Sequence, residues 1–283
     1  YGDHRDLHLS LRRQRQMCIR DRVNIAINAA RLAAKEIHKF ARRMDKVKIY
    51  EKGPTDFVTQ VDEIAEKIII STINDSFPES SYICEESGRS GPENAELVWV
   101  IDPIDGTTNF IHGFPYYSIS IACYEKEILS HGVIYDITRD DEYYASKGKG
   151  AYLNQERLRV SKIKSLKNSL LCNSFHSGKI EPELNTLDVI RKLYSHNLTL
   201  RRTGSTAIDL AYVAAGRLDA FVGYGMKHWD FAAGNLLVQE AGGYVSNFFG
   251  EATVDNSHHL IAGNKNCVEL ILQDIKELSL IHI

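Results

Sequence analysis

The spacing of apolar residues in the first part of the chain predicts two helices. Between Val23 and Met44, apolar residues recur with a helical period and basic residues stand between them, which is typical of an amphipathic helix. Gly53-Pro54 ends this segment, and Phe57–Thr59 is a short extended piece. A second helix is predicted from about Asp62 to Asn74.

Short apolar runs after residue 80 predict a sheet. Two runs are apolar enough to be buried strands, Tyr82–Cys84 and Leu97–Ile101. Three later segments have the pattern of antiparallel strands, namely Ser118–Tyr124, Gly132–Tyr135 and Glu142–Ala145. Gly148-Lys149-Gly150 closes this part of the chain.

After about residue 155, strand and helix segments alternate. The predicted strands are Ser169–Asn173, Asn197–Arg202 and Ala220–Val222, and the predicted helices are Pro182–Ser195, Thr206–Ala215 and Asp230–Ala241. A glycine follows each of the last two helices, where a left-handed residue commonly ends a helix. The sequence has no internal repeat or long linker. We therefore expect one packed unit with an α+β, metal-binding half, residues 23–150, and an α/β half, residues 151–278.

The two ends of the chain differ from the rest in composition. Arginines outnumber acidic residues within residues 1–22, and the string RQRQMCIRDR at 13–22, like LSLIHI at 278–283, resembles translated sequencing-adapter sequence. Residues 1–22 and 279–283 are therefore predicted to be non-native or disordered tails.

Composition and charge narrow the class of protein. Hydrophobic residues make up 43% of the 283 residues and charged residues 25%, which is the balance of a soluble chain with a sizeable core. The net charge of −3 argues against a nucleic-acid partner, and the longest apolar runs are too short for a membrane span. Five cysteines without a C-x-x-C pair favour free thiols and a cytoplasmic location.

One acidic loop has the clearest chemical signal. The run that ends at Ile101 leads into Asp102-Pro-Ile-Asp105-Gly-Thr107, which places two carboxylates after a buried strand. Proline favours a turn, so Asp102, the Ile104 carbonyl and Asp105 can face one point. Gly106 allows a ligand to approach closely, and the free N–H groups before a helix that Thr107 opens suit a phosphate. Taken alone, the segment is also compatible with an acidic surface turn.

Further carboxylates stand at the ends of other predicted elements. Asp62 and Asp230 lie at helix starts, where each serves by default as an N-cap, and Glu85 directly follows a strand. Together with Asp102 and Asp105 they form a set that repels itself unless cations neutralise it. Because oxygen ligands favour Mg²⁺ or Mn²⁺ over zinc, the sequence predicts a site for such ions.

These segments together resemble the inositol monophosphatase family, which is part of the Mg²⁺-dependent, lithium-sensitive sugar phosphatase superfamily. The matching motifs are Lys52-Gly-Pro-Thr-Asp56-Phe-Val-Thr-Gln-Val-Asp62, Glu85-Glu86-Ser87-Gly88, Asp102-Pro-Ile-Asp105-Gly-Thr107-Thr-Asn-Phe, Arg202-Thr-Gly204-Ser205-Thr206-Ala-Ile-Asp209-Leu-Ala and Trp229-Asp230-Phe-Ala-Ala-Gly. They occur in family order over roughly residues 23–275. The resemblance implies a five-layered αβαβα sandwich that is usually a homodimer.

The resemblance also implies a role for each matching residue. The metal ligands would be Glu85, Asp102, the Ile104 carbonyl, Asp105 and Asp230, which hold two Mg²⁺ ions, with a third near Glu85. The substrate would meet Asp105, Gly106, Thr107, Gly204, Ser205, Thr206 and the position of Gly223. The catalytic residues would be Thr107, Asp62 and Glu85, with Thr107 hydrogen-bonded to Asp62 and helping to deprotonate the metal-bound water. Mn²⁺ is an alternative to Mg²⁺, and the resemblance implies that Li⁺ inhibits.

The predicted reaction is the hydrolysis of a small polyol or sugar phosphate, with inositol 1-phosphate as the reference substrate. Metal ions screen the charge of the doubly anionic phosphate ester from the attacking water, so the reaction needs no covalent nucleophile. The sequence also has no evident Ser-His or Cys-His constellation. The Asp-x-x-Asp-Gly-Thr spacing excludes the haloacid-dehalogenase phosphatases. The alternatives are a fructose-1,6-bisphosphatase, a histidinol phosphatase or a nucleotide 3′-phosphatase, or a phosphatase scaffold with a protein- or RNA-binding role.

One position departs from the family pattern. Inositol monophosphatases usually have a glutamate seven residues before the Trp-Asp aspartate, where it accepts hydrogen bonds from inositol hydroxyls. Here that position is Gly223. Without the acceptor we expect weaker discrimination between polyols, and a Gly223→Glu variant that prefers inositol phosphate.

Overall fold

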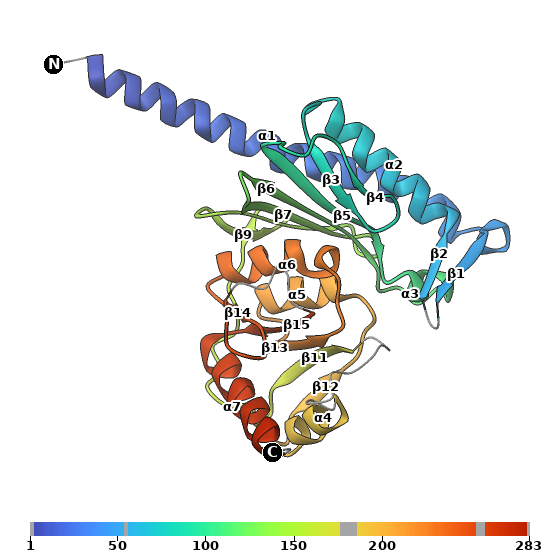
Figure 1. Ribbon diagram of the computed structural model, residues 1–283, viewed down its shortest axis with the longest axis vertical. Coiled ribbons are helices and arrows are strands. Elements are labelled where there is room, and N and C mark those ends of the chain that lie inside the picture. The colour runs from blue at the N-terminus through green and yellow to red at the C-terminus, as the bar shows by residue number, and fades with distance from the viewer. Residues whose placement is uncertain (1–2, 54–55, 176–185, 253–257, 282–283) are drawn as a thin grey trace.

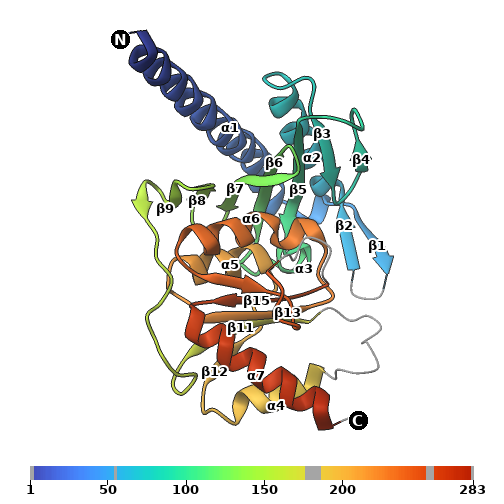
Figure 2. The ribbon, with the colours of Figure 1, turned by 60° about the vertical axis from the view of Figure 1, so that its left-hand side comes forward.

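The helices and sheets form five alternating layers, αβαβα (Figure 1). The structure is a computed structural model that describes residues 3–53, 56–175, 186–252 and 258–281. Helices α1 (Asp3–Ala41) and α2 (Gln60–Asn74) cover one face of an eight-stranded sheet. Helices α5 (Thr206–Ala214) and α6 (His228–Glu240) lie between this sheet and a five-stranded one, as Figure 2 also shows. The predicted sandwich is confirmed.

The outermost layer consists of two helices. These are α4 (Thr186–Tyr194) and α7 (Lys265–Ile281), which pack together on the far side of the five-stranded sheet. Residues 182–185 of the predicted helix at α4 lie outside the described residues. Helix α7 was not predicted, although the buried residues Cys267, Ile271 and Ile275 of this helix recur at helical spacing.

Helix α1 begins well before the predicted start at Val23. Residues 3–22 continue the helix without a break, because this stretch holds leucine, arginine and glutamine and neither glycine nor proline. Arg22 contacts the body of the protein: its Nε lies 3.2 Å from Glu125 Oε1, and its guanidinium lies over the Phe77 ring. The helix boundary was therefore wrong, while the non-native origin of the two ends stays a prediction.

The eight-stranded sheet confirms the strands predicted for the first half. Its spatial order is β10-β9-β8-β7-β6-β5-β3-β4. The strands are β3 (Ser81–Cys84), β4 (Gly88–Ser90), β5 (Leu97–Asp105), β6 (Ser118–Glu125), β7 (Ile128–Asp136), β8 (Asp141–Ser146), β9 (Gly150–Leu153) and β10 (Glu156–Arg157). Strand β3 runs parallel to β5, and the other pairs are antiparallel. Strand β5 continues past Ile101 to Asp105 with a register shift after Asp102, where Pro103 cannot donate to the ladder.

The five-stranded sheet has the order β12-β11-β13-β15-β14. Its strands are β11 (Leu170–Phe175), β12 (Thr199–Arg201), β13 (Ala220–Tyr224), β14 (Tyr244–Ser246) and β15 (His259–Gly263), of which the last two were not predicted. Strands β11, β12 and β13 are parallel, so their carboxyl ends meet at one edge. The segments that follow β12 and β13 lead to α5 and α6. The two halves of the chain meet where α5 and α6 pack on the eight-stranded sheet, and the start of α5 donates hydrogen bonds to Asp105 of β5.

Smaller elements complete the fold. A hairpin of β1 (Ile49–Gly53) and β2 (Asp56–Thr59) leads into α2, and the short helix α3 (Thr107–Ile111) follows β5. A 3-10 turn, Met44–Lys46, follows α1. Across the described part of the chain, no helix combines the length and the apolar character needed to cross a bilayer.

Candidate active site

The end of β5 gathers carboxylates from both halves of the chain. Asp102 and Asp105 belong to β5, and Glu85 follows the parallel strand β3, where its N–H donates to the Ile101 carbonyl at 3.1 Å. Asp230 lies in the first turn of α6, which packs on β5. Asp102, Asp105 and Asp230 are all buried. The fold therefore brings together the acidic residues that the sequence predicted as metal ligands.

Asp102 lies at the centre of this group. Burial raises the pKa of Asp102 well above its usual value, and the carboxylates of Glu85, Asp105 and Asp230 raise that pKa further. The Ile104 N–H donates to Asp102 Oδ1 at 3.1 Å. No lysine or arginine in the described ranges forms an ion pair with Asp102. Its charge is thus opposed by like charges, and no basic residue among those described balances it.

Asp105 is bound by the start of α5. The Ser205 hydroxyl and the Ala207 N–H donate to its Oδ2 at 2.5 and 2.7 Å, and the Thr206 N–H lies 3.3 Å from Oδ1. Burial raises the pKa of Asp105 to about 6, and these hydrogen bonds oppose the rise. Ser205 and Thr206, which were predicted to meet the substrate, therefore contact a predicted metal ligand.

Asp62 and Thr107 lie side by side, as the resemblance implied. Thr107 Oγ1 is 3.2 Å from Asp62 Oδ1 and 3.0 Å from the Ile104 carbonyl oxygen. Asp62 is fully buried, which raises its pKa, while hydrogen bonds from Thr59 oppose that rise. A carboxylate that accepts a hydrogen bond from a hydroxyl beside the carboxylate cluster is suitably placed to receive a proton.

The default role of Asp62 and Asp230 as N-caps was wrong. Thr59 caps α2 and Lys227 precedes α6, so both aspartates stand three residues further on. Each reaches back to the N–H of the capping residue, with Oδ2 accepting from Thr59 and from Lys227 at 2.8 Å. This is the reciprocal half of a capping box, and it holds both carboxylates in fixed orientations.

The predicted glycines have different surroundings. Gly106 has φ +99°, and a Cβ there would lie 3.1 Å from the carbonyl oxygens of Gly204 and Tyr116. Gly204 has φ +91°, and a Cβ would meet the Asn109 amide at 2.8 Å. These two glycines therefore lie together beside Thr107. Gly223 is instead buried against Met226, whose Sδ would lie 2.6 Å from a Cβ at 223.

Sequence reasoning missed Glu66, which supports the loop that carries Glu85. Glu66 is buried and accepts hydrogen bonds from the N–H groups of Glu86 and Ser87 at 2.9 and 3.0 Å. A signal was present, because Glu66 lies on the buried face of α2 beside Ala65. A glutamate on an apolar helix face usually has a partner.

The donor set fits a hard divalent cation. Its atoms are carboxylate oxygens and the Ile104 carbonyl, which Mg²⁺ prefers, and their mutual repulsion favours a bound cation. In the described part of the chain, no three His, Cys, Asp or Glu side chains already converge closely enough to hold an ion. The chemistry of the donor atoms fits the ion, and their assignment as its ligands stays a prediction.

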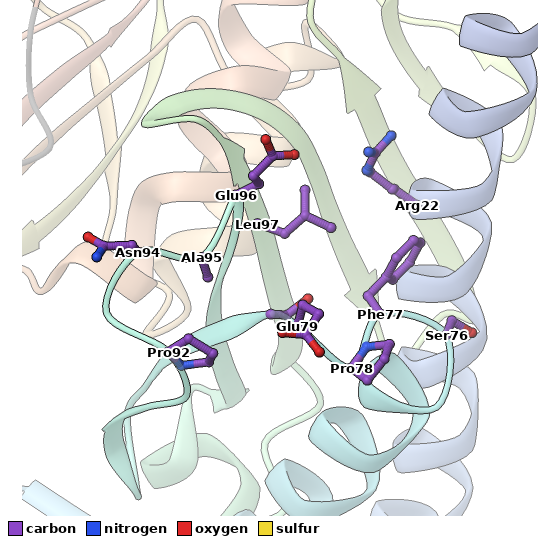
Figure 3. Close-up of a pocket in the computed structure, with 11 residues that line it drawn as sticks. Arg22, Ser76, Phe77, Pro78, Glu79, Pro92, Asn94, Ala95, Glu96 and Leu97 are labelled. Carbon is purple, nitrogen blue, oxygen red and sulfur yellow. The ribbon is translucent and has the colours of Figure 1, made fainter.

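A cavity of about 520 Å³ lies elsewhere, beside Leu97 at the opposite end of β5 from Asp105 (Figure 3). Its walls include Arg22, Phe77, Glu79 and Glu96. No predicted site residue lines it. The carboxylate cluster is therefore the candidate active site on chemical grounds.

Fold and site together define an αβαβα sandwich of the sugar phosphatase superfamily. The family model "Inositol monophosphatase family" matches residues 19–280, and the chain belongs to that family. It is 45% identical over 258 residues to the Nus factor SuhB of Pseudomonas aeruginosa, covering 90% of this chain and 95% of that protein.

Solved structures have the same fold. The extragenic suppressor protein suhB of Bartonella henselae matches with a TM-score of 0.85 at 34% identity, covering 90% of this chain and 98% of that one. The Thermotoga maritima IMPase matches with a TM-score of 0.81 at 33% identity, covering 91% and 98%. Family membership supports a phosphatase of this superfamily.

Proposed function

We propose that this protein is a Mg²⁺-dependent phosphomonoesterase that hydrolyses inositol 1-phosphate and related polyol or sugar phosphates with an activated water. The observation that carries this proposal is the cluster formed by the buried Asp102, Asp105 and Asp230 with the half-buried Glu85. The four residues come from both halves of the chain, and the charges of Glu85, Asp105 and Asp230 raise the pKa of Asp102. A fold that keeps like charges together in its interior is suited to a cationic ligand.

The ion ligands in this proposal are Glu85, Asp102, the Ile104 carbonyl, Asp105 and Asp230. They would hold two ions, with a third near Glu85 and with Mn²⁺ as a substitute. Li⁺ inhibition is carried over from the family resemblance. When bound, the ions would screen the phosphate, lower the pKa of the attacking water and stabilise the leaving oxygen.

The chain's own residues move the proton and hold the phosphate. The Thr107 hydroxyl takes a proton from the attacking water as it passes its own proton to Asp62 Oδ1, which lies 3.2 Å away. Glu85 is the third catalytic residue of the proposal. The backbone N–H groups of Gly106 and Thr107 bind the phosphate, since Gly106 has no Cβ that would block its approach. Asp105 is held at a fixed distance from them by its bonds to Ser205 and Ala207.

Phosphate release measured with Mg²⁺ and with EDTA tests this function. The substrate panel is inositol 1-phosphate, fructose 1,6-bisphosphate, histidinol phosphate and a nucleotide 3′-phosphate. We expect release that requires Mg²⁺ and is greatest with inositol 1-phosphate or another small polyol phosphate. Absence of Mg²⁺-dependent release from every substrate would contradict the proposal.

Specificity depends in this proposal on Gly223 and Met226. Met226 fills the space beside Gly223, so a glutamate there must displace the Met226 side chain. We therefore expect Gly223→Glu alone to disturb packing, and Gly223→Glu with Met226→Ala to shift preference toward inositol 1-phosphate. Met226→Ala alone is the matched control. A parent enzyme that already prefers inositol 1-phosphate by a hundredfold would make the missing glutamate irrelevant.

A second role is favoured by one observation, the name Nus factor SuhB of the P. aeruginosa relative. A protein- or RNA-binding role beside catalysis should survive Asp102→Asn, whereas phosphate release should not. A cytoplasmic homodimer is part of the proposal as well. Its support is the family resemblance, together with the free, buried thiols of Cys84, Cys123, Cys172 and Cys267.

A further inference from the structure

Asn109 joins two loops that are distant in sequence. Its side-chain Nδ2 donates to the carbonyl oxygens of Tyr116 and Thr203 at 2.7 and 2.9 Å. Asn109 lies in α3, just after the Asp102–Thr107 segment, and Thr203 lies in the loop between β12 and α5. One amide therefore connects the N-terminal half of the site to the C-terminal half.

Asp209 holds the side chains of the same two residues. Its Oδ1 accepts a hydrogen bond from the Tyr116 hydroxyl at 2.8 Å, and the Thr203 hydroxyl lies 2.7 and 2.8 Å from its two oxygens. Asp209 is 1% exposed and lies in α5. Tyr116 and Thr203 are thus held by their carbonyls on one side and by their hydroxyls on the other. We call Asn109, Tyr116, Thr203 and Asp209 the bracket.

We propose that Asn109 and Asp209 are positioning residues, which through the bracket hold the start of α5 against the Asp102–Thr107 segment. The proposal rests on the proposed phosphatase function for its catalytic consequence. Two independent features place the bracket at the same junction. The N–H groups of Thr206 and Ala207 bind Asp105 directly, and Gly204 packs on the Asn109 amide without room for a Cβ.

The position of Asp105 depends on this junction. Asp105 belongs to β5, and Ser118 of β6 also hydrogen-bonds its carboxylate. Its donors Ser205 and Ala207 lie at the start of α5. If the loop before α5 moves away, Asp105 loses those donors and turns relative to Asp102. A misplacement of about 1 Å at a reacting centre can cost on the order of 100-fold in rate, so the bracket should affect turnover more than substrate binding.

Four variants test the proposal, each judged by two readouts. Asn109→Ala removes both carbonyl links, and Asp209→Ala removes the acceptor for both hydroxyls. Asp209→Asn keeps one acceptor oxygen and is the conservative rescue. Asp274→Asn is the matched control, because Asp274 is a buried carboxylate in the outer layer that binds His196.

The first readout is amide hydrogen exchange at Thr206 and Ala207 without added metal, and the second is kcat and KM at saturating Mg²⁺. In Asn109→Ala and Asp209→Ala we expect exchange at Ala207 to rise at least tenfold and kcat to fall at least tenfold, with KM within threefold. Asp209→Asn should recover most of both, and Asp274→Asn should change neither.

Unchanged exchange and kcat in folded Asn109→Ala and Asp209→Ala would overturn the proposal, as would a loss of thermal stability alone. If either alanine variant does not fold, Thr203→Val and Tyr116→Phe each remove a single hydroxyl and are judged by the same criteria. The exchange measurement does not depend on catalysis. An inactive parent would therefore contradict the proposed function and leave the bracket to be decided by exchange.

Discussion

Asp102 and Asp136 are buried aspartates near the ends of strands in the same sheet, yet their surroundings are opposite. Asp136 is completely buried and accepts hydrogen bonds from the Thr138 hydroxyl at 2.7 Å and from the Arg139 guanidinium at 3.0 Å. Asp102 is 2% exposed, and the charged groups that raise its pKa are Glu85, Asp105 and Asp230.

The difference separates a carboxylate paired within the protein from one that we propose to bind a cation. The chain itself supplies the cation that balances Asp136, and the turn between β7 and β8 closes around that pair. Around Asp102 the described residues supply further negative charge, which a proton or, in our proposal, a cation from solution would balance. Removing the charge of Asp102 should therefore lower turnover and leave the protein folded. Removing the charge of Asp136 should instead lower stability and leave turnover nearly unchanged.

The largest effect is expected on turnover. Asp102→Asn, Asp105→Asn and Asp230→Asn should each lower Mg²⁺-dependent phosphate release at least a thousandfold, about 4 kcal/mol in barrier. The proteins should stay folded, because each change removes repulsion. Asp136→Asn is the control, with kcat within about threefold of the parent once the folded fraction is measured. Turnover within about tenfold, or 1.4 kcal/mol, would remove that residue from the ligand set.

Asp209 is an intermediate case, since it has hydroxyl donors but no ion pair with a basic residue in the described segments. Burial raises its pKa to about 7, so below that pH the folded protein binds a proton that the unfolded chain has released. This contribution to stability is complete below pH 4 and is lost as pH rises through 7. Asp209→Asn has no such titration.

The free energy of unfolding of Asp209→Asn minus that of the parent should therefore increase by about 3 kcal/mol between pH 5 and pH 8. Urea unfolding of both proteins at several pH values measures this difference, and groups common to both cancel. A difference that is independent of pH would show that Asp209 is ionised throughout.

A smaller effect is expected from Mg²⁺ on stability. At a free concentration ten times its Kd, the ion should raise the free energy of unfolding by about 1.4 kcal/mol. Thermal unfolding should show this shift in the parent and in Asp136→Asn, and not in Asp102→Asn. NaCl at equal ionic strength is the control for screening. An equal shift in both variants would mean that Mg²⁺ binds outside the cluster.

The smallest effect is expected where a carboxylate is paired near the surface. The Arg22 and Glu125 side chains are 20% and 33% exposed, so their ion pair should contribute less than about 1 kcal/mol. Removing residues 1–21 should leave activity and melting temperature nearly unchanged, and adding Arg22→Ala should lower the melting temperature slightly. Removing residues 279–283 should also have little effect. A loss of more than a few degrees from either truncation would show that the ends contribute to the core.

Much of the site could be predicted because its residues are neighbours in the chain. Asp102, Ile104, Asp105 and Thr107 follow one another after an apolar strand, and the strand carries them to one place. Asp62 and Asp230 were located correctly at helix starts, but their exact place in the first turn depends on which residue caps the helix. In both cases the predicted cap lies three residues after the observed one, because helix ends are weakly encoded in local sequence.

By itself, the sequence determined the two long helices and the central strands of the first half, the strands β11, β12 and β13 of the second, and the carboxylates available for a cation. Only the tertiary structure decided that Ser205 and Ala207 bind Asp105, that Asn109 reaches Thr203, and that Met226 fills the space beside Gly223. The spacing of apolar residues is a local signal that covers one or two helical turns or a few strand residues. It therefore determines which face of an element is buried. Contacts such as those of Asp105 with α5 join residues about a hundred positions apart, and they exist only once the two sheets have packed against the helices between them.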